Sequence, residues 1–228
     1  EALNEVTLGL DWPEAPERFQ RLKESIALIE QLWAGERVTF DGTYYSVKDA
    51  TVYDRPEHPV PVYIGASGPA ATRLAGRIAD GYITTSGKDP KLYTDTLLPA
   101  LHEGLEKAGR SLDAVDTLME VKVSYHPDRD VALEKTRFWA PLALSPEEKR
   151  DVHDPVEMQR LAAELPIERV ASRFIVSTDP DEHVDQIARY VDLGFRHLVF
   201  HDPGFDQPEF LRMYGAEILP RLRARFGA

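Results

Sequence analysis

The sequence has 228 residues, of which 43% are hydrophobic and 9% aromatic, which is enough apolar material for one large core or two small ones. Its 27 Lys and Arg against 39 Asp and Glu give a net charge of −12, which argues against nucleic acid or an anionic membrane as a partner. The absence of cysteine excludes disulfides and thiolate metal sites and fits a cytoplasmic location, and no apolar run approaches the roughly 20 residues of a membrane span.

The N-terminal part predicts a helix followed by a hairpin. Residues 1–5 resemble the middle of a loop, and because the first residue is Glu1 and not Met, we expect further sequence upstream. Apolar side chains recur at three- and four-residue steps over 13–33, which indicates an amphipathic helix. The run 38–45 contains Asp41-Gly42 between two β-rich segments and predicts a tight hairpin, an insertion covering about 38–48.

Strand and helix patterns then alternate, which is typical of parallel βα units. We predict strands at 60–64, 81–85, 118–125 and 197–201, and helices at 69–79, 92–108, 181–193 and 208–225. A further helical stretch, about 131–171, interrupts the alternation and is a candidate excursion on the substrate side. About four strands are half of the eight in a closed barrel, so the sheet is either small and open or half of a barrel.

Two segments at predicted strand ends could bind an anionic ligand, because ligands bind beyond the carboxyl ends of parallel strands. Residues 65–71 link a strand to a helix through small residues, and they form either a phosphate-binding turn at the helix N-terminus or a tight turn without a ligand. Residues 84–88 offer hydroxyls, a glycine and Lys88, which suits a phosphomonoester but also fits a capped helix start with a solvated lysine.

The remaining polar residues are individually less informative. Lys149 and Arg173 would each be a surface charge unless the fold brings them together. The histidines lack the spacing of metal ligands, so we predict no metal site.

Five segments together resemble the F420-dependent glucose-6-phosphate dehydrogenases, a branch of the luciferase-like barrels. They are 1–5, 61–69, 80–88, Thr-Arg-Phe-Trp-Ala-Pro-Leu at 136–142, and His-Leu-Val-Phe-His-Asp-Pro-Gly at 197–204. The Asp-Gly pair at 80–81 is common across luciferase-like barrels, whereas Thr-Ser-Gly-Lys at 85–88 together with 136–142 is specific to the sugar-phosphate branch. The resemblance covers essentially the whole chain.

The resemblance implies the fold and the reaction. The fold would be an α/β (β/α)8 TIM barrel of the bacterial luciferase type, with residues 1–228 forming its C-terminal part, about strands 5 to 8. The reaction would be oxidation of glucose 6-phosphate to 6-phosphogluconolactone with hydride transfer to the deazaflavin coenzyme F420. Family members are usually homodimers. We expect this chain to be inactive alone, because the family's catalytic histidine lies upstream of it and half a barrel exposes edge strands.

The resemblance also assigns residues, position by position. The substrate phosphate would be held by Thr85, Lys88, Lys149 and Arg173. The coenzyme would contact Asn4, Ser67, Gly68, Ala70 and Ala71, with Ser67 standing where the family often has glycine. Glu1 would be the acid that delivers a proton to the deazaflavin ring.

Two alternatives remain at this point. The chain could be an F420-dependent luciferase-like oxidoreductase with a different substrate, in which case the four phosphate ligands would be coincidental. It could also be a non-catalytic half-barrel that binds a phosphorylated ligand or a partner protein.

Overall fold

The computed structural model describes residues 2–35 and 37–227, which fall into two compact units, Glu1–Val62 and Tyr63–Ala228. In the described part of the chain, no helix is both long and apolar enough to cross a membrane.

The first unit contains two helices and a hairpin. Helix α1 (Ala2–Thr7) occupies residues for which the sequence indicated a loop, and the Thr7 hydroxyl donates to the Leu3 carbonyl at 2.6 Å within it. Its Ala, Leu and Glu residues are good helix formers, which explains the difference. Helix α2 (Ala15–Ala34) confirms the amphipathic helix predicted over 13–33, and the Gly35 amide closes it on the Gln31 carbonyl.

The hairpin differs from the tight turn that Asp41-Gly42 predicts. Strands β1 (Val38–Asp41) and β2 (Ser46–Ala50) are antiparallel, and Asp41 pairs with Ser46, so the connection is longer than two residues. The reason lies in α2, where a Glu24 carboxylate oxygen accepts hydrogen bonds from the amides of Tyr44 (2.8 Å) and Tyr45 (2.7 Å). These amides bind the helix instead of pairing with β1.

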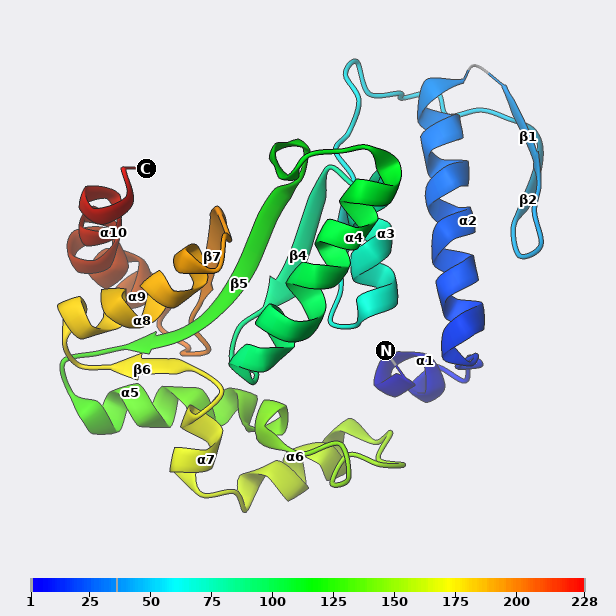
Figure 1. Ribbon diagram of the computed structural model, residues 1–228. Coiled ribbons are helices and arrows are strands. Elements are labelled where there is room, and N and C mark those ends of the chain that lie inside the picture. The colour runs from blue at the N-terminus through cyan, green and yellow to red at the C-terminus, as the bar shows by residue number, and fades with distance from the viewer. Residues whose placement is uncertain (1, 36, 228) are drawn as a thin grey trace. The chain divides into compact units, whose positions relative to one another are not determined.

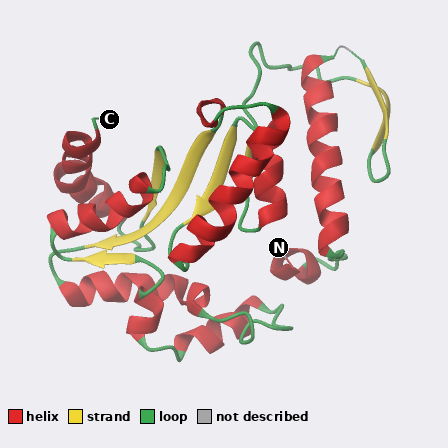
Figure 2. Ribbon diagram, in the orientation of Figure 1, coloured by secondary structure: helices red, strands yellow, loops and turns green. Residues whose placement is uncertain are grey.

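The second unit is a five-stranded parallel sheet with helices between its strands (Figures 1 and 2). The strands are β3 (Tyr63–Gly65), β4 (Gly81–Thr85), β5 (Asp116–Tyr125), β6 (Ile175–Ser177) and β7 (His197–His201). The α/β class and the predicted parallel pairing are confirmed. Strand β6 was missed because three residues give too short a pattern to distinguish from the end of the preceding helix.

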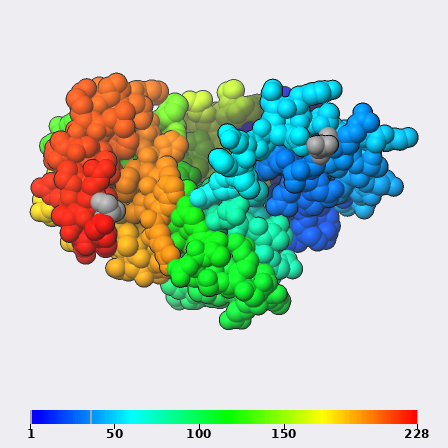
Figure 3. Space-filling model, turned by 90° about the horizontal axis from the view of Figure 1, so that it is seen from above, coloured from blue at the N-terminus to red at the C-terminus, as the bar shows by residue number. Residues whose placement is uncertain are grey.

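Helical segments connect these strands and follow the last of them. They are α3 (Pro69–Ile78), the π-helical turn Leu92–Leu97 with α4 (Leu98–Ala108), the 3-10 turn Leu112–Ala114, α5 (Arg129–Lys135) with the 3-10 segment η3 (Thr136–Ala143), α6 (Pro155–Ala163), α7 (Ile167–Ala171), α8 (Pro180–Asp192), and α9 (Gln207–Met213) with the π-helical turn η4 (Tyr214–Ile218) and α10 (Leu219–Phe226). The segments α5, η3, α6 and α7 pack on one another (Figure 1), and they enclose a small apolar cluster of Ala140, Leu144, Ala162, Leu165 and Val170. The segments after β7 are α9, η4 and α10, and η4 and α10 pack against α8. These segments are coloured orange to red in the space-filling view (Figure 3).

Strand β5 organises the sheet because both of its edges are paired. The Ser86 amide donates to the Glu120 carbonyl (2.8 Å), and the His126 amide donates to the Ser177 carbonyl (3.4 Å). Backbone groups an even number of residues apart point to the same edge of a strand. Strands β4 and β6 therefore pair with the same edge of β5, β4 as far as Glu120 and β6 from Val123 onwards. Strand β7 occupies the opposite edge.

The two faces of the sheet differ in character. Met119, Val121 and Val123 of β5 are fully buried. The residues that alternate with them lie in register with neighbours on the other face, which we call the polar face. Its members are Tyr63, Ile83, Thr85, Asp116, Leu118, Glu120, Lys122, His197, Val199 and His201. Asp116 connects β5 to β3 and β7 at the N-terminal end of these strands. One of its carboxylate oxygens lies 2.8 Å from the Tyr63 hydroxyl and 2.9 Å from His197 Nδ1.

Helices α3 and α4 approach so closely that glycine is needed on both. A Cβ at Gly104 would lie 2.2 Å from the Arg73 carbonyl oxygen, whereas a Cβ at Gly215 in the turn before α10 would meet no atom within 4 Å. Gly104→Ala is therefore expected to lower the free energy of unfolding by about 1–3 kcal/mol through overpacking. Gly215→Ala, the matched control, should raise it by up to about 1 kcal/mol because alanine favours helices. Urea unfolding of both variants checks this, and equal effects would contradict the close packing.

The buried His183 makes stability depend on pH. Its side chain is fully buried in α8, its Nε2 lies 2.7 Å from the Tyr214 hydroxyl, and burial lowers its pKa from 6.5 to about 4. The folded state thus favours the neutral ring, so this stabilisation is complete above pH 6.5 and is lost as the pH falls towards 4. The loss is about 3 kcal/mol at most. His183→Gln should show a shallower decline of unfolding free energy over this range in denaturant titrations, and parallel pH profiles would contradict the assignment.

Candidate active site

The turn that follows β4 is anchored on β5. Ser86 is buried, its amide donates to the Glu120 carbonyl (2.8 Å), and its hydroxyl oxygen accepts from the Lys122 amide (2.7 Å). The Ser86 hydroxyl therefore accepts the bond from the Lys122 amide that a carbonyl of β4 would accept if the strand pairing continued. This fixes the position at which Gly87 and Lys88 leave the sheet.

Gly87 brings the turn against the segment that leads into β6. Its φ of +75° lies in the left-handed region, and an added Cβ would lie 2.1 Å from the Arg173 carbonyl oxygen. No residue with a side chain fits there without moving one of the two backbones. The contact explains why Lys88 and Arg173, which are distant in sequence, lie close together.

Lys88 and Arg173 both line one cavity of about 480 Å³. The cavity is lined by Ser86, Gly87, Lys88, Asp89, Pro90, Tyr93, Ser172, Arg173, Phe174, Ile175, Arg189, Tyr190 and Leu193. Burial lowers the pKa of the Lys88 ammonium, and the charge of Arg173 lowers it further. The Arg173 Nε is buried and has no hydrogen-bond partner among the described residues. A site with this excess of positive charge suits an anion.

A second contact links Lys88 to the start of α3. The Lys88 ammonium donates to the Ser67 hydroxyl oxygen at 2.6 Å. Gly68 caps α3 in an extended conformation, Pro69 begins it, and no side chain of the described residues caps its first turn. The amides of Ala70 and Ala71 belong to that turn, where a helix has unsatisfied donors that bind anionic groups. The predicted coenzyme residues of this turn and the predicted phosphate ligand Lys88 are thus neighbours.

The other predicted site residues lie elsewhere. Thr85 is not in the cavity lining, because its register with Glu120 places it on the polar face. Lys149 lies in the turns between η3 and α6, where its amide donates to the Ser145 carbonyl at 3.1 Å, and it is also outside the cavity lining. Asn4 is in α1 of the first unit, and Glu1 lies outside the described residues.

Sequence reasoning missed a set of charged and aromatic contacts on the polar face. A Glu120 carboxylate oxygen lies 3.8 Å from the Lys122 ammonium and 3.3 Å from His201 Nδ1, and the His201 ring meets the Trp139 ring edge-on with centroids 4.3 Å apart. The signal was present, since two charged residues alternate with apolar ones in a strand predicted to be buried. Within the described ranges, no cluster of His, Cys, Asp or Glu could hold a metal ion.

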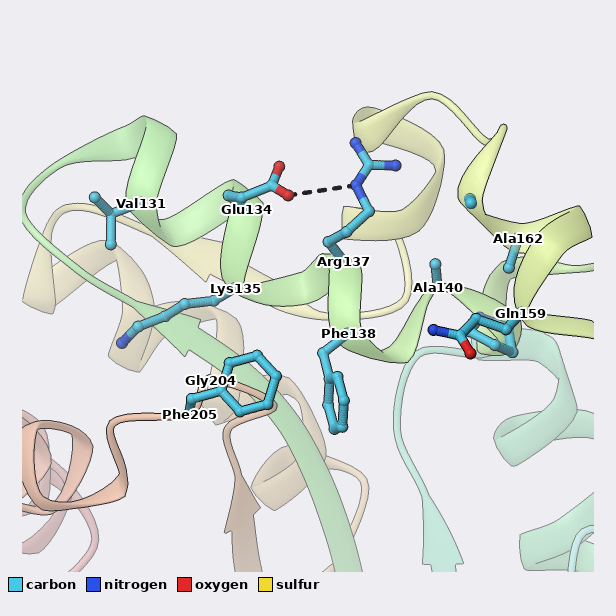
Figure 4. Close-up of a pocket in the computed structure, with 12 residues that line it drawn as sticks. Val131, Glu134, Lys135, Arg137, Phe138, Ala140, Gln159, Ala162, Gly204 and Phe205 are labelled. Carbon is cyan, nitrogen blue, oxygen red and sulfur yellow. Dashed lines mark ion pairs between the residues drawn. The ribbon is translucent and has the colours of Figure 1, made fainter. Parts of the chain in front are cut away.

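A larger cavity of about 800 Å³ lies beside α5 and η3, where the segments 136–142 and 197–204 meet (Figure 4). Phe138 and Phe205 pack together at its wall, with ring centroids 4.7 Å apart. Lys135 is nine-tenths buried, and its ammonium lies 3.8 Å from Asp202 and 3.7 Å from Glu209. These contacts join the loop after β7 to α5.

Comparison with known proteins gives consistent results. The family model described as luciferase-like monooxygenase matches residues 2–197. Two proteins named F420-dependent glucose-6-phosphate dehydrogenase are similar to this chain. The one from Microbacterium testaceum (strain StLB037) is 83% identical over 99% of this chain, and the one from Nakamurella multipartita is 71% identical over 100% of it. Each match covers 67% of the relative. The chain thus spans about two thirds of these curated relatives.

A solved structure of an F420-dependent secondary alcohol dehydrogenase in complex with an F420-acetone adduct also matches. Its TM-score is 0.87 at 29% identity, and the match covers 98% of this chain and 67% of that one.

The contact at Gly87 can be tested with a matched pair of glycines. Gly87→Ala and Gly109→Ala both place a side chain at positive φ, +75° and +65°, but a Cβ at Gly109 meets no atom within 4 Å. We expect Gly109→Ala to cost about 1 kcal/mol of unfolding free energy through backbone strain alone. Gly87→Ala should cost at least about 2 kcal/mol more, because the turn must also move away from Arg173. Chemical denaturation of both variants measures the difference, and equal costs would mean that the two backbones are not held together.

Proposed function

Because this chain belongs to the luciferase-like monooxygenase family, and within it to the F420-dependent glucose-6-phosphate dehydrogenases, we propose that its site oxidises glucose 6-phosphate to 6-phosphogluconolactone with coenzyme F420 as the hydride acceptor. The observation that supports this most directly is the convergence of Lys88 and Arg173 on one cavity, next to the uncapped start of α3. The cavity supplies cations for a phosphate, and the helix start supplies amides for the coenzyme.

The coenzyme fits the residues present. The first turn of α3 lacks a capping side chain, and a Cβ at Gly65 or Gly68 would meet no atom within 4 Å, so a ligand can approach the backbone there. We assign Ser67, Gly68, Ala70 and Ala71 to this contact, and by the family resemblance alone we assign Asn4 to the coenzyme. When bound, F420 supplies the redox chemistry by accepting a hydride.

The chain's own residues bind and orient the sugar phosphate. Lys88 and Arg173 supply charge-assisted hydrogen bonds, which are roughly twice as strong as neutral ones. Thr85 adds a hydroxyl from the polar face, and we assign Lys149 as a further cation contributed by the segment after η3. Fixing the phosphate orients the far end of the sugar, where the bond to be oxidised lies.

Three further assignments rest on the family resemblance. We propose that Glu1 is the acid that delivers a proton to the coenzyme ring. Strands β3, β4, β5 and β7 would be strands 5 to 8 of one (β/α)8 barrel, with the hairpin of 38–48 as an insertion and 131–171 as a helical excursion on the substrate side. The enzyme would act as a homodimer in the cytoplasm.

Removal of either cation tests the substrate. In the protein expressed from its complete reading frame, Lys88→Met and Arg173→Met should each raise KM for glucose 6-phosphate by about 10- to 100-fold, since a charge-assisted hydrogen bond is lost. The measurement is the decline of the visible absorbance of F420 on addition of glucose 6-phosphate, with glucose as the unphosphorylated comparison.

Lys91→Met is the matched control, because Lys91 is exposed near the same turn, and KM should not change. Rapid reduction by glucose 6-phosphate but not by glucose would support both the coenzyme and the phosphate site. Bound F420 without reduction would favour a related oxidoreductase with a different substrate, and failure to bind F420 would favour a non-catalytic binding module.

A further inference from the structure

Lys122 is a buried cation whose position follows from strand register. In the pairing of β5 with β4, Glu120 lies beside Thr85, and Lys122 is the next residue of β5 on the polar face. In the pairing with β7, Lys122 lies beside His201. The register therefore places Lys122 two residues along β5 from the partner of Thr85. Its amide donates to the Ser86 hydroxyl oxygen, at the start of the turn that carries Lys88.

The burial of this ammonium is costly and incompletely compensated. Lys122 is 7% exposed, its Nζ lies 3.5 Å from the Ser86 carbonyl oxygen, and the nearest Glu120 carboxylate oxygen is 3.8 Å away. An ammonium has three donors, and both distances are at or beyond the length of a good hydrogen bond. An apolar side chain of similar length would fill the same space at lower cost. Stability alone therefore does not account for a lysine here.

The surrounding charges indicate what the lysine is for. Burial lowers the pKa of Lys122, Glu120 opposes this effect, and the positive charges of Arg173 and Lys88 lower the pKa further. Lys88 stands at the end of β4, Arg173 stands before β6, and Glu120 contacts His201 on β7. With Glu120 as a counter-ion, the cations Lys88, Arg173 and Lys122 still leave an excess of positive charge, which suits a phosphate dianion.

We propose that Lys122 is a positioning residue of the sugar-phosphate site, which holds the Ser86–Lys88 turn through its contacts with Ser86 and adds a positive charge to those of Lys88, Arg173 and Lys149. Glu120 is its counter-ion and limits the excess charge. This inference rests on the proposed function, because it assumes that the anion bound at this site is the phosphate of the substrate. It adds Lys122 and Glu120 to the residues already assigned.

The test removes the charge and keeps the shape. In the protein expressed from its complete reading frame, Lys122→Met should weaken binding of inorganic phosphate, measured by calorimetry, by at least about tenfold. KM for glucose 6-phosphate should rise by a similar factor, with a smaller change in kcat. The midpoint of thermal unfolding and the affinity for F420 should not fall, because methionine fills the space without the desolvation cost.

Three further variants sharpen the test. Lys122→Arg keeps the charge and should restore phosphate affinity to within about threefold of the wild type. Glu120→Gln removes the counter-ion and should change phosphate affinity in the opposite direction, by tightening it. Lys135→Met removes a similarly buried ammonium from the other charged cluster and should leave phosphate affinity unchanged.

The outcomes separate this inference from the proposed function. Unchanged phosphate affinity in Lys122→Met, in an enzyme that oxidises glucose 6-phosphate, would overturn the assignment of Lys122 and leave the function intact. A joint loss of thermal stability, F420 affinity and phosphate affinity would also overturn it, since the lysine would then be structural. If the wild type does not oxidise glucose 6-phosphate but binds inorganic phosphate more tightly than Lys122→Met, the function fails and the anion site stands.

Discussion

The parallel hydrogen bonding of β5 is the constraint on which the second unit depends. Its 10 residues pair with β4 and then β6 along one edge and with β7 along the other, so every other strand except β3 takes its position from it. The candidate site forms where the pairing partner along this edge of β5 changes from β4 to β6. There Ser86 makes the last bond to β5, and Gly87 turns against the backbone that leads into β6. Lys88 and Arg173 are neighbours as a result of sheet geometry and not of any attraction between them.

The positive charges of Lys88, Lys122 and Arg173 near this change of pairing partner oppose folding. Each ammonium loses hydration, and the positive charges repel one another, which is why the pKa values of Lys88 and Lys122 are both lowered. Glu120 compensates in part. In a protein of net charge −12, such a cluster stands out from the acidic surface and gives an anionic substrate one favourable place to bind. The rest of the fold supplies the stability that this arrangement costs.

Sequence patterns predicted the elements well and their assembly less well. Periodicity located α2 and the long strands, because both depend on local alternation of apolar residues. The hairpin turn was misjudged because Glu24, distant in sequence, captures two amides of the loop. The motif 85–88 pointed to a ligand site, but the role of each residue needed the structure: Lys88 brings a charge to the cavity lining, Ser86 and Gly87 line it and also fix the turn, and Thr85 lies on the polar face. The alternation of Glu120 and Lys122 with apolar residues is visible in the sequence, but their neighbours Thr85 and His201 are shown only by the strand register.

The alternation of side chains along β5 has a consequence for how such enzymes diverge. Met119, Val121 and Val123 are buried in the packed core, whereas Glu120 and Lys122 contact one another, His201 of β7 and the turn at Ser86. Mutations on the second set can alter the charge offered to a ligand without repacking the helices behind the sheet. Preference for a different substrate can therefore evolve by a few exchanges on one side of a single strand, while the architecture is inherited unchanged.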